Sequence, residues 1–133
     1  MGVGDNNAVY GPDARFTHKP VSFYVHAVAN SQADVEQFEF TPPYNFEIVG
    51  FEVYAGSVTA TASLDLKIAT VSCLSAALTP VAAASAKATI NSDGTEYGDA
   101  DDAVTVHATT NGSGAIGTMN GQIWIRRKAA DVS

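Results

Sequence analysis

The sequence predicts an all-β chain that folds as a single-domain, jelly-roll-like β-sandwich. Seven or eight short segments alternate apolar and polar residues with a period of two, and clusters of Gly, Asn, Asp and Pro separate them. No long segment has the periodicity of an amphipathic helix, which argues against an α/β fold. At 133 residues, the chain has the length of one domain.

The first strand is expected over residues 21–28. Its odd-numbered side chains should share one face: Val21, Phe23, Val25 and Ala27. Residues 35–40 allow two structures, because Ser31 and Asp34 can begin a short helical turn while the run itself alternates as a strand. The double proline that follows ends an extended segment, so a strand is favoured.

Two strands are expected in the middle of the chain. Residues 45–54 are largely apolar on both faces, as in a central strand covered on two sides, and Gly50 is a candidate site for a β-bulge. Residues 63–69 alternate most clearly, and their inward-facing side chains are Leu64, Leu66 and Ile68.

Residues 71–88 are rich in Ala and Ser, so helix propensity competes there with a loose hairpin. Pro80 breaks any long helix, and extended segments are therefore expected around residues 74–78 and 84–90.

The last third of the chain predicts two further strands. A turn at residues 91–94 and a polar loop at 99–102 precede a buried stripe of Val104, Val106 and Ala108. The Gly-rich residues 112–121 are expected to be a hairpin connection to the final strand, residues 122–127. In that strand Ile123 and Ile125 face one way and Trp124 the other.

Composition excludes several classes of partner and segment. Fourteen acids against seven bases give a net charge of −7, which opposes binding to nucleic acids and anionic membranes. The longest weakly polar stretch, residues 76–86, is too short and polar to span a bilayer, and residues 1–7 lack the pattern of a secretory signal. The single Cys73 excludes an internal disulfide and is expected to pack as a small hydrophobe.

Three segments are predicted from these patterns: an N-terminal arm at residues 1–17, a sandwich domain at 18–128 and a short tail at 129–133. The arm is Gly/Asn/Asp-rich with isolated apolar residues, which is typical of a flexible segment that orders on a partner. Its candidate partner contacts are Val9, Tyr10 and Phe16.

No metal or other cofactor is predicted. Five carboxylates lie within ten residues: Asp93, Glu96, Asp99, Asp101 and Asp102. Their spacing does not match a calcium-binding loop, so a solvated acidic loop is the better interpretation, and a metal-dependent enzyme is the third choice of function. The three histidines are scattered and no Cys pair accompanies them, which gives a zinc site little support.

No catalytic residue is predicted, and the chain is expected not to be an enzyme. A G-x-S-x-G nucleophile motif is absent, the Gly-rich stretch lacks the Lys-Ser/Thr pair of a phosphate loop, and Cys73 has no reactive context. Glu47 and Glu52 are candidate paired carboxylates for glycoside hydrolysis, but alternation puts them on opposite faces unless Gly50 bulges.

Two groups of side chains are candidates for binding. Arg126, Arg127 and Lys128 concentrate three of the seven bases, either to dock an acidic partner or to protect a strand edge from pairing. Six aromatic residues fall near the arm or strand ends, where an interface or a sugar can stack, although half or more should close the core: Tyr10, Phe16, Tyr24, Tyr44, Tyr54 and Tyr97.

Four motifs together carry a family resemblance. They are S-L-D-L-K-I at residues 63–68, A-T-I-N-S-D-G at 88–94, D-D-A-V-T-V at 101–106 and N-G-S-G-A-I-G-T-M-N-G-Q-I-W-I-R-R at 111–127. This pattern resembles small β-sandwich structural proteins of tailed bacteriophage virions, of the capsid decoration and head-fibre type. The match covers about the C-terminal two-thirds of the chain, and its short motifs also occur in tail-fibre modules.

The resemblance implies a non-enzymatic capsid decoration protein on the exterior of the virion, made in the host cytoplasm. Such a protein binds the major capsid protein and stabilises the head, often as a homotrimer. The alternative function is a receptor- or glycan-binding module of a phage tail or fibre, motivated by the exposed-looking tyrosines.

Overall fold

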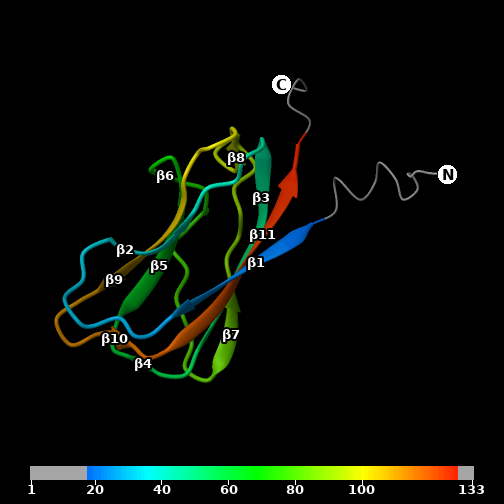
Figure 1. Cartoon of the computed structure of the whole chain (residues 1–133). Helices are drawn as coiled ribbons and strands as arrows, with labels where there is room; N and C mark the ends of the chain where they lie inside the picture. The colour runs from blue at the N-terminus through cyan, green and yellow to red at the C-terminus, as the bar shows by residue number, and fades with distance from the viewer. Residues whose placement is uncertain (1–17, 129–133) are drawn as a thin grey trace.

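Two antiparallel sheets lie face to face in the computed structural model, which describes residues 18–128 (Figure 1). Every regular element in this part of the chain is a strand, and seven strands have four or more residues. The predicted all-β sandwich is therefore confirmed. No helix among residues 18–128 is long and apolar enough to cross a membrane.

The first sheet has five strands in the order β1, β11, β3 and β7, with β8 pairing the start of β3. Their bounds are β1 Lys19–Val25, β11 Met119–Arg127, β3 Phe46–Ala55, β7 Ala84–Lys87 and β8 Tyr97–Gly98. Lys19 lies opposite Ile125, so the first and last strands of the described residues are neighbours.

The second sheet has four strands in the order β2, β9, β5 and β6. Their bounds are β2 Val35–Phe40, β9 Val104–Thr110, β5 Ala62–Ile68 and β6 Val71–Ser72. A small third sheet pairs β10, Ala115–Ile116, with β4, Val58–Thr59. It lies at one end of the sandwich (Figure 1).

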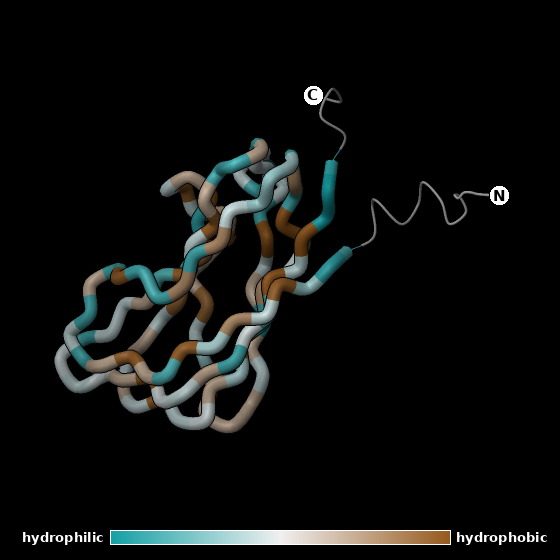
Figure 2. The backbone as a smooth tube through the Cα atoms, in the orientation of Figure 1, coloured by the Kyte–Doolittle hydropathy of each residue, from teal (hydrophilic) through white to brown (hydrophobic). Residues whose placement is uncertain are grey.

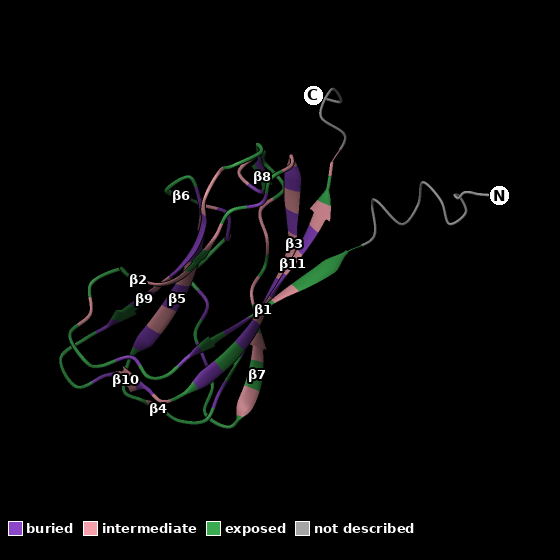
Figure 3. Cartoon of the chain, in the orientation of Figure 1, coloured by how far each residue is buried: buried purple, intermediate pink, exposed green. Residues whose placement is uncertain are grey.

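The core is built from the inner faces of the two main sheets (Figures 2 and 3). In β5, buried side chains alternate with partly exposed ones over the whole strand, and β9 contributes the predicted stripe of Val104, Val106 and Ala108. Each fully buried Leu, Ile or Phe side chain contributes about 1.5–3 kcal/mol, so this interior is the main source of stability.

A β-bulge in β3 decides which of its residues face the core. Before the bulge the buried residues are even-numbered, Phe46 and Ile48. After it they are odd-numbered, Phe51, Val53 and Ala55. Trp124 pairs with Gly50 but Ile125 pairs with Ile48, so Val49 is the extra residue. This confirms the predicted bulge at Gly50, where an added Cβ would lie 3.1 Å from the Trp124 side chain. The prediction that β3 is covered on two sides is wrong, because the bulge moves both apolar sets to one face.

The first strand differs from its prediction, whereas the second is the strand that was favoured. β1 ends at Val25, after which the chain turns, so Ala27 is exposed and Val28 is buried and pairs with Ile116. Residues 35–40 form the favoured strand, β2. Ser31 and Asp34 adopt positive φ angles of 59° and 56°, which no helical turn contains.

Two connections also differ. Residues 84–87 form a strand within the expected 84–90, whereas 74–78 contributes only isolated bridges, Leu74 to Ile90 and Leu78 to Leu64. The hairpin predicted at 112–121 is wrong, because β9 and β11 lie in different sheets. That segment carries the chain between the layers, and its β10 pairs with β4 on the way.

Candidate binding surfaces

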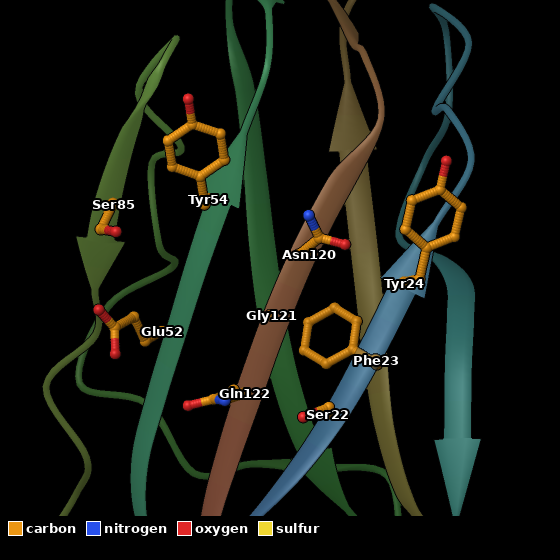
Figure 4. A pocket seen from close by; sticks show the side chains of 9 residues that line it. All are labelled: Ser22, Phe23, Tyr24, Glu52, Tyr54, Ser85, Asn120, Gly121 and Gln122. Atoms are coloured by element: carbon orange, nitrogen blue, oxygen red, sulfur yellow. The ribbon is translucent and has the colours of Figure 1, made fainter.

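A hollow of about 570 Å³ lies on the outer face of the five-stranded sheet, across β1, β11, β3 and β7 (Figure 4). We call it the sheet hollow. Strand register places Tyr24 opposite Asn120, and Asn120 opposite Tyr54. Tyr54 in turn lies opposite Ser85. These residues form one row across four strands.

A second row lies one step along the same strands. Ser22 is opposite Gln122, which is opposite Glu52. Within residues 18–128, none of the polar side chains that line the sheet hollow forms a hydrogen bond to another residue. Their donors and acceptors therefore face solvent.

The floor of the sheet hollow is part of the core. An added Cβ at Gly121 would lie 2.2 Å from the buried ring of Phe23, which is its cross-strand partner. That ring also stacks on Phe38 and Phe51, with centroids 5.2 and 6.1 Å away. Only glycine allows the Phe23 ring to lie this close to β11. Because Phe38 and Phe51 pack against the same ring, the floor is held rigidly in place.

The described tyrosines are mostly exposed. Tyr24 is 58% exposed, and Tyr54 and Tyr97 are each 44% exposed, while Tyr44 packs against the core. Of the six aromatic candidates, one of the four described residues therefore closes the core, and Tyr10 and Phe16 lie outside the described residues. Alternation predicts that Tyr24 lies on the face opposite Phe23, but no local pattern indicates that β1 and β3 flank the same strand.

The three bases at the end of β11 are held against their own chain. Arg126 forms an ion pair with Glu47, the Arg127 guanidinium lies 5.3 Å from the Tyr44 ring, and the Lys128 ammonium lies 3.7 Å from the Tyr97 ring. β11 is an internal strand between β1 and β3, so these bases do not protect an edge strand. Docking of an acidic partner stays a prediction.

The arm contacts Val9, Tyr10 and Phe16 lie outside the described residues. The pairing of Lys19 with Ile125 places the start of the described chain beside the end of β11. The described chain therefore begins at the end of the sandwich that carries Arg126, Arg127 and Lys128.

The acidic residues 93–102 bond mainly to their own loop. Glu96 is buried and accepts a hydrogen bond from the Gly94 amide at 2.7 Å, so the loop is not solvated throughout. Asp93 accepts from the Thr95 hydroxyl and amide, and these bonds lower the pKa of Asp93 below its usual value. Asp102 accepts from the Asp99 amide. Among residues 18–128, no group of three or more His, Cys, Asp or Glu side chains is placed to hold a metal ion.

The bulge at Gly50 brings Glu47 and Glu52 to the same face of β3. Glu47 is neutralised by Arg126, and only Glu52 lines the sheet hollow. The two carboxylates therefore do not form the paired site that glycoside hydrolysis needs.

On the four-stranded sheet, His107 contacts both the Thr105 hydroxyl and Asp34. His107 Nε2 is 2.9 Å from the Thr105 hydroxyl, and its Nδ1 is 3.1 Å from the Asp34 carbonyl and 3.5 Å from the Asp34 carboxylate. Lys67 binds that carboxylate at 2.6 Å. Because Asp34 lies just before β2 and His107 lies on β9, these bonds fasten the loop before β2 onto β9. The Thr105 hydroxyl that His107 contacts is buried. The sequence did not indicate this contact, because Asp34 is 73 residues from His107.

Cys73 is fully buried and its thiol lies 3.5 Å from the Leu66 carbonyl. Burial raises the pKa of Cys73 to about 12, so the thiol stays neutral at physiological pH. This confirms that Cys73 packs as a small hydrophobe.

No family model matches the chain, and neither does any curated protein. Among solved structures, a chain of the "Capsid of Ralstonia phage GP4" matches with a TM-score of 0.58 and 17% sequence identity, over 89% of this chain and 89% of that chain. At this identity the likeness is one of fold, and the sandwich described above is thus an architecture that also occurs in a phage capsid.

Proposed function

We propose that the chain is a non-enzymatic structural protein of a phage virion, and that it decorates the outside of the capsid by binding the major capsid protein. The observation that carries the proposal is the fold shared with a chain of the Ralstonia phage GP4 capsid over 89% of both chains.

The physical properties of the chain support a role in an assembly. The interior is apolar and lacks a disulfide, so burial against identical or neighbouring subunits is an effective way to gain stability. A homotrimer on the shell is the favoured arrangement. The net charge of −7 disfavours contact with packaged nucleic acid or with membranes and fits an exterior position.

The end of the sandwich where β1 begins and β11 ends is proposed to face the shell. Residues 1–17 would add an extended segment to a neighbouring edge, and Arg127 and Lys128 would meet acidic groups there. Because Tyr44 and Tyr97 already hold these two cations in place, they lose little side-chain freedom on binding. Residues 18–128 form the domain in this proposal, and 129–133 form a tail.

Quantitative mass spectrometry of purified virions tests the function. A decoration protein is expected at a ratio to the major capsid protein of about one, one-third or one-sixth, according to its symmetry position. A much lower ratio would move the protein to the tail or a fibre, and absence from virions would refute the structural role.

Binding to purified shells tests the docking end. Deletion of residues 1–17 and the double change Arg127→Ala with Lys128→Ala should each weaken binding. Lys87→Ala, on the far strand β7, is the matched control and should bind normally. Undiminished binding by the deletion variant would remove the arm from the proposal.

A further inference from the structure

We propose that the sheet hollow binds a neutral oligosaccharide. This inference rests on the side chains of the five-stranded sheet and not on the fold comparison, so it stands or falls separately from the capsid role.

Two exposed aromatic rings flank the sheet hollow at a suitable spacing. Tyr24 on β1 and Tyr54 on β3 belong to the same row, with Asn120 of β11 between them (Figure 4). Neighbouring strands are about 4.8 Å apart, so the backbones that carry the two tyrosines are separated by roughly 10 Å. Two linked pyranose rings cover such a span, and the C–H face of a sugar packs on an aromatic ring while the tyrosine hydroxyl remains hydrated.

The polar side chains between the tyrosines suit hydroxyl groups. A sugar hydroxyl is both a donor and an acceptor, and the amides of Asn120 and Gln122 each supply both functions. The Glu52 carboxylate adds acceptors only. Since these side chains have no hydrogen-bond partner within residues 18–128, a ligand would break no internal bond to reach them. The rigid floor of Phe23 and Gly121 keeps the row in place.

The charge of the sheet hollow selects a neutral ligand. Among the described residues that line it, Glu52 is ionisable to an anion and none is a cation. The whole chain carries a charge of −7. Sulfated or uronic-acid chains would therefore be repelled, whereas neutral hexose chains would not.

Affinity gel electrophoresis of the full chain tests the proposal. The gels contain one neutral polysaccharide each, hydroxyethyl cellulose, glucomannan, galactomannan or dextran, and a parallel gel contains heparin. We expect retardation by at least one neutral polysaccharide and none by heparin. Truncation of a central aromatic contact typically costs more than 1 kcal/mol, so Tyr24→Ala and Tyr54→Ala should each weaken binding about tenfold.

Tyr97→Ala is the matched control, because Tyr97 is as exposed as Tyr54 but lies on β8 outside the sheet hollow. It should bind like the unmodified chain. All three changes are at exposed positions, and equal urea midpoints would show that each variant is folded.

Several results would overturn the inference. These are no retardation by any neutral polysaccharide, retardation by heparin alone, or unchanged binding by both tyrosine variants. Self-association that Tyr24→Ala abolishes, without sugar binding, would assign the face to a contact between copies. A Tyr24→Ala variant that loses sugar binding but keeps shell binding would support the inference and leave the capsid role intact.

Discussion

The two outer faces of the sandwich are both polar, but they use their polar groups differently. On the four-stranded sheet, Lys67 binds Asp34 at 2.6 Å, His107 reaches Thr105 at 2.9 Å, and the Ser72 hydroxyl donates to Asp65 at 2.6 Å. On the five-stranded sheet, the polar side chains that line the sheet hollow have no such partner within residues 18–128. We call the first the closed face, because its central polar groups bond to one another, and the second the open face, because the polar groups of the sheet hollow bond only to solvent.

This difference separates stability from binding. A hydrogen bond between two side chains fixes their positions and contributes a net 0.5–1.5 kcal/mol or so to folding. A side chain bonded only to water contributes little to folding, and it can exchange that water for a ligand. Changes to the bonded polar side chains of the closed face should therefore alter stability, and changes to the polar side chains that line the sheet hollow should alter binding alone.

Both outer faces rest on one closed core, and Cys73, which is fully buried there, is expected to show the largest effect. The thiol has an ordinary pKa of 9.0 in the unfolded chain and about 12 in the folded chain. Because the folded pKa is the higher, its contribution to stability is present below pH 9 and is lost as the pH rises toward 12. The full loss is on the order of 4 kcal/mol.

The measurement is the urea midpoint of the unmodified chain and of Cys73→Ala from pH 7 to pH 11. The advantage of the cysteine chain should shrink above pH 9, and the thiol should resist a disulfide reagent until urea unfolds the protein. Rapid reaction in native buffer would show that the edge of the four-stranded sheet opens locally.

The floor of the open face is tested by Gly121→Ala. The new methyl group would meet the Phe23 ring, which is locked between Phe38 and Phe51. Overpacking of this kind costs about 1–3 kcal/mol. Gly112→Ala is the control, because nothing lies within 4 Å of its added Cβ. Equal midpoints in urea for the two variants would contradict a rigid floor.

The contrast itself is tested by the same substitution on each face. His107→Leu leaves the buried Thr105 hydroxyl and the Asp34 carbonyl without their partner, and should cost about 1–2 kcal/mol. Gln122→Leu removes no internal bond and should change stability by less than about 0.5 kcal/mol. A larger loss for Gln122→Leu than for His107→Leu, by chemical denaturation, would reverse the comparison.

The sequence predicted which residues face inward far better than which strands are neighbours. Leu64, Leu66 and Ile68 were assigned correctly because alternation is a local property of the chain. Val28 was misassigned because its strand ended earlier than the pattern suggested.

The candidate site was only partly predictable for the same reason. The exposed tyrosines were identified as candidates, but the sheet hollow forms because β11 pairs with both β1 and β3, which brings Asn120 between residues about 100 and 70 positions away. The Asp34–His107 contact likewise depends on a pairing of distant strands. No local pattern encodes such a pairing.

The smallest expected effect concerns the ion pair on the closed face. Lys67→Met keeps the alkyl stem and removes the charge that binds Asp34. The Asp34 side chain is half exposed, so the pair should contribute only about 0.5 kcal/mol in low salt and less in 1 M NaCl. Lys87→Met is the matched control, because Lys87 lies on an exposed position of β7 without an ionic partner among residues 18–128. If both variants shift the urea midpoint equally at low salt, the closed face is held by the His107 bonds rather than by charge.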